Sequence, residues 1–140
     1  MQKSLILKFV TGLFFTFIFH STLIAQKATE EKILGCWKIK SIEFLEINKD
    51  SMNLINSTKG IITCFEKDAK FTTKLKSGTD VQIVGTGTYS ISADGKTFNQ
   101  KRDADDGAVD EPAEIVKFND KEVSFKISKM ILHFERLSKQ

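Results

Sequence analysis

From residue 33 onward, apolar and polar residues alternate with a period of two, and turn-forming residues separate the alternating runs. This pattern predicts β-strands that bury only one face. No helical period of 3.6 is sustained after residue 35, and Pro112 is the only proline. The chain has 140 residues, which is enough for one domain with a real core. We therefore expect a single all-β domain.

The expected hairpins can be tested against each other, because residues that face each other across an antiparallel pair share one face of the sheet. Turns are predicted at 67–69, 77–79, 94–95, 119–120 and 128–129. They place Phe65 opposite Phe71, Thr63 opposite Thr73, Thr73 opposite Ile83, Leu75 opposite Val81, Tyr89 opposite Gln100, Ile91 opposite Phe98, Val116 opposite Val123, Val123 opposite Phe134, Phe125 opposite Leu132 and Ile127 opposite Met130. All these pairs agree on a single inner face.

Eight strands follow from this pattern. They are expected at approximately 35–47, 60–66, 70–76, 81–91, 96–102, 113–118, 121–128 and 130–137. The first strand changes parity, which a β-bulge near Lys40 and Ser41 would reconcile. Gly85 and Gly87 fall on the inner face of the longest strand, where they would let it coil sharply. Eight sequential antiparallel strands form either a sandwich or a barrel, and the short connections favour an eight-stranded antiparallel up-and-down β-barrel.

The run Leu34–Ile39 contains Trp37, the only tryptophan of the chain. A large indole at the start of a β domain usually plugs one end of the core, because its apolar area needs burial and its N–H needs an acceptor. Replacing Trp37 with alanine is therefore expected to destabilise the domain.

Several motifs occur together in one order: Gly35-x-Trp37, then Phe65-x-x-Asp68-x-x-Phe71, then Gly87-x-Tyr89-x-Ile91, then two C-terminal strands. This combination resembles the lipocalin-like domain family, in particular the short exported lipocalin-like proteins of Bacteroidetes-type bacteria, over most of residues 33–137. One departure is Ala69, where that family often has glycine. The resemblance implies a lipocalin-type barrel in which Arg136 on the last strand stacks on Trp37. Gly35, Trp37 and Arg136 are thus expected to close the barrel, and no particular ligand is implied.

Residues 1–25 have the pattern of a secretory signal peptide. Lys3 and Lys8 precede a strongly apolar run, and Ala25 offers a cleavage site before Gln26. The alternative is an uncleaved membrane anchor. Residues 26–32 would then be a polar tether or a first helical turn, and residues 33–140 the barrel. We expect an exported protein, periplasmic or secreted, with no stable membrane span after cleavage.

The sequence Ile33–Cys36 looks like a lipoprotein cleavage box, but four charged residues separate it from the apolar run, so lipidation of Cys36 is not expected. Of the 21 lysines and arginines, two lie in the leader, which leaves 19 against 18 acidic residues. This near balance argues against a nucleic-acid partner. A disulfide between Cys36 and Cys64 would require the first hairpin to turn near Asp50, and we favour two separate buried thiols.

The barrel interior is expected to be mostly apolar with a few polar groups, which is typical of a site for a small hydrophobic or amphiphilic ligand. The candidate ligand-binding residues are Phe71, Thr73, Ile83, Tyr89, Phe98, Gln100, Glu114, Phe125 and Leu132. An eight-stranded barrel is, however, barely wide enough for its own side chains. The alternative is an envelope-associated structural or protein-interaction module with a filled core and an apolar outer patch around Ile115 or Ile131.

The sequence favours a non-catalytic monomer without a cofactor or metal. Glu114 with Arg102 or Tyr89 is the one set that we nominate for catalysis, and His133 is expected on the outer face. Acidic residues gather between the fifth and sixth strands, where they predict a solvated loop, with a Ca²⁺ site or a lid as alternatives. These acidic residues are Asp103, Asp105, Asp106, Asp110 and Glu111.

Overall fold

The structure is a computed structural model that describes residues 24, 26–103 and 111–138. The predicted signal peptide, apart from Ile24, and Asp105, Asp106 and Asp110 of the predicted acidic loop lie outside the described residues. No helix within the described part has the length and apolar character needed to cross a bilayer.

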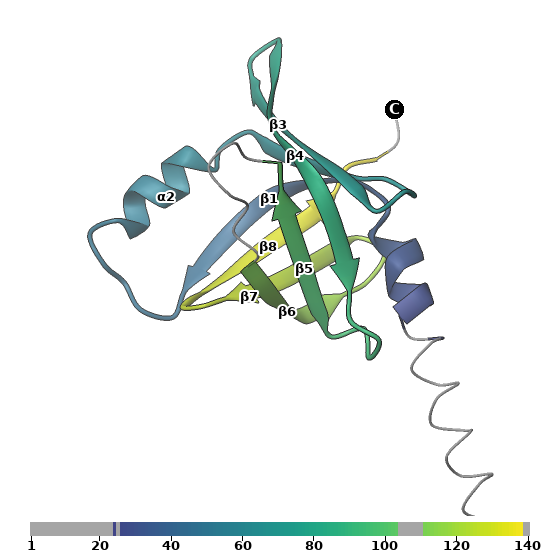
Figure 1. Ribbon diagram of the computed structural model, residues 1–140. Coiled ribbons are helices and arrows are strands. Elements are labelled where there is room, and N and C mark those ends of the chain that lie inside the picture. The colour runs from purple at the N-terminus through teal and green to yellow at the C-terminus, as the bar shows by residue number, and fades with distance from the viewer. Residues whose placement is uncertain (1–23, 25, 104–110, 139–140) are drawn as a thin grey trace, which may run out of the picture.

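The predicted fold class is confirmed. Eight strands form a closed antiparallel barrel in which each strand pairs with its neighbours in sequence and the last strand returns to the first (Figure 1). The strands are β1 (Gly35–Phe44), β2 (Ile61–Phe65), β3 (Lys70–Ser77), β4 (Asp80–Ile91), β5 (Thr97–Arg102), β6 (Glu111–Phe118), β7 (Glu122–Ile127) and β8 (Met130–Arg136). The alternation of apolar and polar residues succeeds as a predictor here because a closed sheet has one inside and one outside.

Most of the predicted registers are correct. Phe65 lies opposite Phe71 across β2 and β3, Ile91 lies opposite Phe98, and Phe125 lies opposite Leu132. The bulge predicted in β1 lies between Ile39 and Ser41. It keeps Trp37 and Ile39 before the bulge, and Ile42 and Phe44 after it, on the same inner face.

The predicted register of β3 against β4 is wrong. The turn has two residues, Gly78 and Thr79, so Ser77 lies opposite Asp80 and Leu75 opposite Gln82. Gly78 adopts a φ of 62°, which a two-residue hairpin turn requires and glycine supplies without strain. A one-residue slip moves side chains to the other face, and here it extends from the turn to a bulge between Ile83 and Gly85. Val81 and Ile83 therefore lie on the outer face, 55% and 67% exposed, and Ile83 does not line the interior.

The predicted register of β6 against β7 is also wrong. Its turn has four residues, because the Asn119 side chain accepts hydrogen bonds from the backbone N–H groups of Lys121 and Glu122, each at 2.9 Å. Phe118 therefore takes the place opposite Val123 that was predicted for Val116. Val116 sits in a bulge and is exposed.

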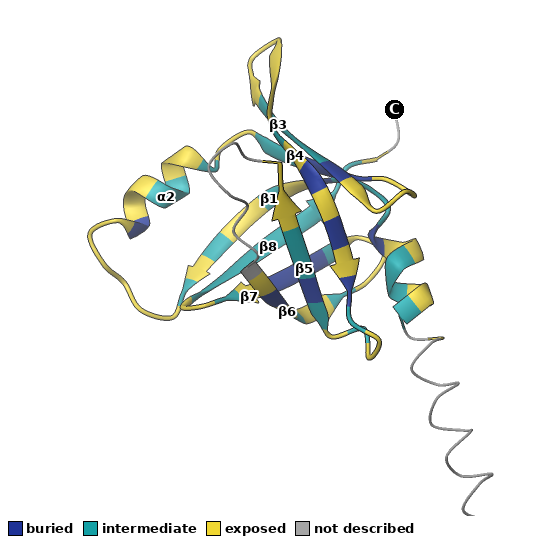
Figure 2. Cartoon of the chain, in the orientation of Figure 1, coloured by how far each residue is buried: buried dark blue, intermediate teal, exposed yellow. Residues whose placement is uncertain are grey.

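The core occupies one half of the barrel, where strands carry the buried residues shown in dark blue in Figure 2. Phe65 makes edge contacts with Tyr89 and Phe98, at centroid distances of 5.0 and 5.5 Å. The ring contacts continue from Phe98 to Phe125 at 4.8 Å and from Phe125 to Phe134 at 5.7 Å. This aromatic cluster fills the width of the barrel with side chains.

The predicted contact between Trp37 and Arg136 is present at the end of this core. Trp37 is fully buried, its Nε1 donates to the Ile33 carbonyl at 2.7 Å, and the Arg136 guanidinium lies 4.2 Å from its ring centroid. Arg136 also donates to the backbone carbonyls of Leu34 at 2.6 Å, of Asp120 at 2.7 Å and of Lys32. We call this end of the barrel the closed end.

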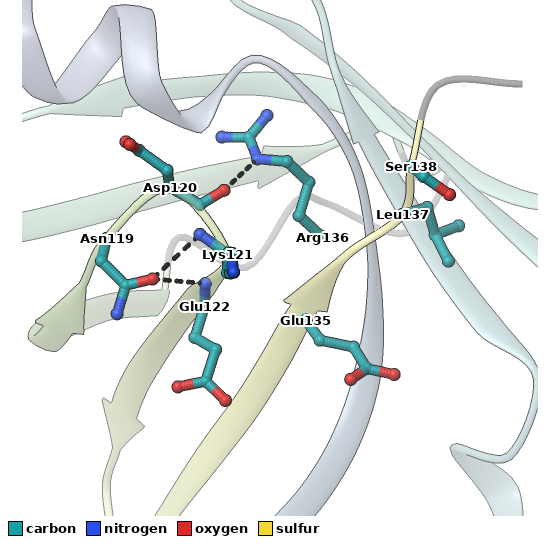
Figure 3. Close-up of a pocket in the computed structure, with 8 residues that line it drawn as sticks. All are labelled: Asn119, Asp120, Lys121, Glu122, Glu135, Arg136, Leu137 and Ser138. Atoms are coloured by element: carbon teal, nitrogen blue, oxygen red, sulfur yellow. Dashed lines mark hydrogen bonds between the residues drawn. The ribbon is translucent and has the colours of Figure 1, made fainter.

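Gly35 belongs to the closed end because of its backbone. Its φ of +117° lies in the region that favours glycine, and a Cβ there would stand 3.0 Å from Arg136 Nη1. Figure 3 shows the side chains at this corner, where residues 119–122 and 135–138 line a pocket. The dashed bonds there hold the β6–β7 turn and Arg136 in place, so the pocket reflects barrel closure.

Two helical segments join the barrel. Residues 26–33 are helical (Figure 1), where the sequence predicts a tether or a first helical turn over residues 26–32. The Gln26 side chain donates to the Ile91 carbonyl at 3.1 Å. The helix α2 (Ser51–Ser57) lies in the connection between β1 and β2, and the sequence pattern did not predict it. Seven residues are too few to show a helical period.

The expectation of separate thiols is wrong, because Cys36 and Cys64 form a disulfide. The two cysteines lie directly opposite each other in the register of β1 and β2. The long connection through α2 hides this pairing from the sequence, since the two strands do not form a short hairpin.

Candidate functional site

The candidate functional site lies at the barrel end opposite Trp37, which we call the open end. Inner-face residues there are only half-buried, although the registers place them on the same face as the buried core. They are Ile42, Phe44, Ile61, Leu75, Met130 and Leu132. The packed aromatic cluster and these half-buried residues divide the interior into a filled half and an open half.

A groove with a volume of 540 Å³ adjoins the open half, between α2 and the ends of β1 and β8. Its apolar lining comes from Phe44 of β1, Met130 of β8 and Leu54 of α2. The polar lining is contributed by Glu46, Asn48, Asp50, Ser51, Asn53, Ser57, Ser128 and Lys129. The volume falls within the range of small-molecule sites, and the mixture of apolar surface with polar groups suits an amphiphile.

Local hydrogen bonds hold α2 over this groove. The Asn48 side chain accepts from the Asp50 N–H at 3.0 Å and from the Ser51 hydroxyl at 3.2 Å, while the Asn48 N–H donates to Ser51 Oγ at 3.1 Å. Ser51 is buried as a result. Asparagine and serine readily bond neighbouring backbone groups in this way, which favours a turn ahead of the helix.

The β7–β8 turn forms the opposite wall of the groove. The Leu45 N–H donates to the Lys129 carbonyl at 2.8 Å, which ties the end of β1 to this turn. The Lys129 ammonium pairs with Glu46, and both side chains are well exposed. An exposed pair contributes little stability. Both charged groups nevertheless line the groove.

The predicted ligand-binding residues separate into three groups. Phe71, Tyr89, Phe98 and Phe125 are buried in the filled core. Thr73, Gln100 and Leu132 are half-buried, nearer the open half. The third group, Ile83 and Glu114, lies on the outer face.

The position of Glu114 differs most clearly from the predicted one, which was inside the barrel. Its side chain is 63% exposed and lies 3.9 Å from the Lys126 ammonium, whereas its neighbour Ala113 points inward and is buried. The bulge at Val116, between Ile115 and Lys117, reversed its expected direction. The expectation that Glu114 lines the interior is therefore wrong.

The nominated catalytic set is not assembled. Arg102 is exposed at the end of β5, opposite Gly87, while Glu114 faces outward. Tyr89 lies in the core and donates its hydroxyl to the Glu66 carbonyl at 2.9 Å. Burial, with smaller contributions from Glu30 and Asp68, raises the pKa of Tyr89 above its ordinary value. It is therefore a structural hydrogen-bond donor.

His133 lies between two polar partners on the outer face. Ser124 Oγ lies 2.8 Å from its Nδ1, and a Glu43 carboxylate oxygen lies 3.5 Å from its Nε2. The order resembles a catalytic triad, but Ser124 is only 2% exposed and a substrate could not reach it. The arrangement satisfies a buried hydroxyl in the outer wall of the sheet.

One group of ionic contacts at the surface surrounds Glu122. Glu122 lies between the ammonium groups of Lys117 and Lys40, at 2.5 and 2.9 Å. Hydrogen bonds from Lys117 and then from Lys40 lower the pKa of Glu122 to about 2. No three histidine, cysteine or acidic side chains among the described residues are grouped so that they could hold a metal ion.

The groove residues Phe44, Leu54 and Met130 were missed by the sequence reasoning. Phe44 and Met130 were assigned to strands, but they lie opposite each other only because β1 pairs with β8. These two strands are the farthest apart in the sequence, and their pairing closes the barrel. The turn residues Asn48, Asp50 and Ser51 followed by Met52, Leu54 and Ile55 were the available signal for α2.

Comparison with known proteins places the fold. No family model and no curated protein matches the chain. A crystal structure of an uncharacterized protein from Bacteroides eggerthii superposes with a TM-score of 0.60 at 9% identity, over 74% of this chain and 98% of that one.

Two further solved structures from Bacteroides are similar. A lipocalin-like protein from Bacteroides uniformis has a TM-score of 0.54 at 9% identity, over 76% of this chain and 99% of that one. A DUF4847 family protein from Bacteroides vulgatus has a TM-score of 0.54 at 12% identity, over 81% and 99%. The chain therefore has a lipocalin-like fold, which confirms the resemblance predicted from its sequence motifs.

Proposed function

We propose that the protein is an exported, non-catalytic binding protein that holds a small hydrophobic or amphiphilic molecule at the open end of its barrel. The observation that carries this proposal is the groove lined by Phe44, Leu54 and Met130, which adjoins the half-buried inner residues. Because the aromatic cluster fills the other half, the ligand would not reach the closed end.

The groove suggests how such a ligand would lie. Its apolar part would pack on Phe44, Leu54 and Met130, since burial of apolar surface is the main favourable term in binding molecules of this kind. Its polar end would point to the rim, where Asn48 and Lys129 offer hydrogen-bond donors. Lys129 would favour a head group with negative charge.

Export is supported by two features. The first 25 residues have the pattern of a signal peptide. The Cys36–Cys64 disulfide is of a kind that persists in oxidising compartments outside the cytosol. The proposal is therefore a periplasmic or secreted protein.

The test is purification of the protein from its native envelope or medium, followed by mass spectrometry of the small molecules that it retains. An amphiphilic fluorescent probe, 1-anilinonaphthalene-8-sulfonate, would be titrated in parallel. Met130→Trp would fill the groove and is expected to weaken probe binding at least about tenfold. Val116→Trp alters an exposed apolar residue away from the groove and is the matched control. Equal probe affinity in both variants would contradict this site.

A second candidate function is a structural or protein-interaction module of the envelope, and the filled aromatic half of the barrel favours it. The outer apolar patch expected around Ile115 is not supported, since Ile115 packs against the core. If the native protein retains no small molecule and binds the probe no better than Met130→Trp does, this second function becomes the better one.

A further inference from the structure

The strand β4 extends beyond its neighbour β5. It has 12 residues, whereas β5 has six and pairs with β4 only from Gly87 to Ile91. One further bond joins the Asp103 N–H to the Thr86 carbonyl at 2.9 Å. Within the described residues, no strand pairs with the β5 side of residues 80–85. Figure 1 shows the β3–β4 hairpin projecting from the barrel. We call residues 80–85 the free edge of β4.

The direction of the backbone groups at the free edge follows from one hydrogen bond. The Lys76 N–H donates to the Gly60 carbonyl at 2.9 Å, so the backbone of Lys76 points away from β4. Lys76 and Val81, which lie opposite each other, are then a non-hydrogen-bonded pair. The N–H and C=O groups of Val81, and those of Ile83 two residues later, therefore point away from β3, to the free edge.

The side chains of the free edge are suited to a further strand. Val81 and Ile83 are β-branched and exposed on the outer face, and Val84 is also exposed. Asp80 is the only charged residue of this edge. An exposed edge with β-branched residues and little charge is a template for another strand. A lipid surface would fit it poorly, because it cannot satisfy backbone N–H and C=O groups.

We propose that the free edge pairs with the same edge of a second copy of this chain, antiparallel about a two-fold axis that passes through Gln82. Val81 of each copy would then lie opposite Ile83 of the other, which joins the outward-facing backbone groups of both residues in hydrogen bonds. The same register brings β-branched side chains into cross-strand contact and places no like charges opposite each other. The sequence predicts a monomer, and a closed barrel has no free strand edges. The projecting β3–β4 hairpin provides such an edge, so we expect a dimer instead.

The register can be tested by cross-linking. On the two-fold axis, the Gln82 residues of the two copies form a non-hydrogen-bonded pair, whose short Cα separation suits a disulfide. The Gln82→Cys variant is expected to form a covalent dimer on mild oxidation, seen on a non-reducing gel. Val116→Cys, also exposed but far from the free edge in sequence and on β6, is the matched control and is expected to form no covalent dimer. Equal cross-linking of both variants, or of neither, would overturn the proposed register.

Proline variants test the pairing without a new thiol. Because the Ile83 N–H points away from β3, Ile83→Pro removes a donor of the free edge but no bond of the β3–β4 ladder. Sedimentation of the purified, oxidised protein over a wide range of concentration is expected to show a monomer–dimer equilibrium, weakened at least about tenfold by Ile83→Pro and by Val81→Pro.

A thermal melt of each proline variant shows whether the barrel is intact, and Ile83→Lys serves as a second variant if the prolines unfold it. A wild-type protein that stays monomeric throughout, or that dimerises equally after these substitutions, would overturn the proposal. A monomer that recruits an added peptide strand instead would also overturn it, since the occupant would then be another chain.

Discussion

Arg136 lies over the face of Trp37, with its guanidinium carbon 4.2 Å from the ring centroid, and the two residues are opposite each other in the β1–β8 pairing. The arginine also donates to three backbone carbonyls, at Lys32, Leu34 and Asp120. One side chain therefore ties together the N-terminal helical segment, the β6–β7 turn and the seam where the barrel closes. Substitutions of Trp37 and Arg136 therefore test what stabilises the closed barrel.

Replacing Trp37 with alanine is expected to lower the free energy of unfolding by about 3–5 kcal/mol, the usual cost of truncating a large aromatic core residue. Trp37 is fully buried and its N–H has an acceptor, so the change leaves both a cavity and an unpaired carbonyl at Ile33. Urea unfolding followed by far-UV circular dichroism measures the effect. Unchanged stability would refute the role of Trp37 in closing the barrel.

Replacing Arg136 with lysine tests whether the shape of the guanidinium group, as well as its charge, contributes to the stability of the barrel. Lysine keeps the positive charge but loses the planar fork that reaches several carbonyls and stacks on the indole. The expected loss of stability is roughly 1–2 kcal/mol. Lys126→Arg, on the exposed side of β7, is the control and should change stability little.

Removing the disulfide is expected to destabilise the barrel. The cysteines are separated by 28 residues in sequence, and closing a loop of that size contributes about 2–4 kcal/mol. The variant with both Cys36→Ala and Cys64→Ala should therefore unfold at lower urea, and a reducing agent should affect the wild type but not this variant. A reductant-insensitive wild type would contradict the disulfide.

Gly87 is expected not to tolerate a side chain. A Cβ at this position would stand 2.1 Å from the Lys101 carbonyl oxygen and 2.7 Å from a ring atom of Phe71. Gly87→Ala should cost about 1–3 kcal/mol through overpacking. Gly85→Ala is a matched control on the same strand, since its Cβ would meet only Thr73, at 3.9 Å. Thermal unfolding of the two variants compares them directly.

The ion pairs of Glu122 with Lys117 and Lys40 are expected to stabilise the fold at neutral pH and to lose this effect in acid. Its folded-state pKa is lowered to about 2 from an ordinary value of 4.5, so the folded state binds the proton less readily than the unfolded chain does. The stabilisation is fully present above the unfolded pKa and is lost as the pH falls through the folded one. Wild type should thus exceed Glu122→Gln in stability at neutral pH, and the difference should fade between about pH 4.5 and 2. A difference that does not change with pH would exclude the ion pairs as its cause.

The sequence predicted the class of fold because its signals are local. Strict alternation and short turns such as Asp94-Gly95 define strands and hairpins, and a bulge in β1 follows from the parity change between Ile39 and Ile42. The contact of Trp37 with Arg136 was implied by the resemblance to lipocalin-like domains, and it agrees with a closed barrel, which brings the first and last strands together.

The errors arose where a turn length or a β-bulge decided the face or the register of a strand. Gly78 and Thr79 form a two-residue turn and Asn119 organises a four-residue one, and each moved one strand by one or two positions. The slip at the Gly78–Thr79 turn moved Ile83 to the outer face, and the bulge at Val116 moved Glu114 there. Turn lengths depend on side-chain bonds such as those of Asn119, which alternation does not report.

The alternating pattern and motifs of this chain determined by themselves that it is an up-and-down barrel with a plugged end. Only the tertiary structure decided that Cys36 meets Cys64, that the aromatic rings fill one half of the interior, and that Phe44, Leu54 and Met130 form a groove at the other end. The physical reason is that these contacts join residues distant in sequence, and their geometry depends on the register of every strand between them.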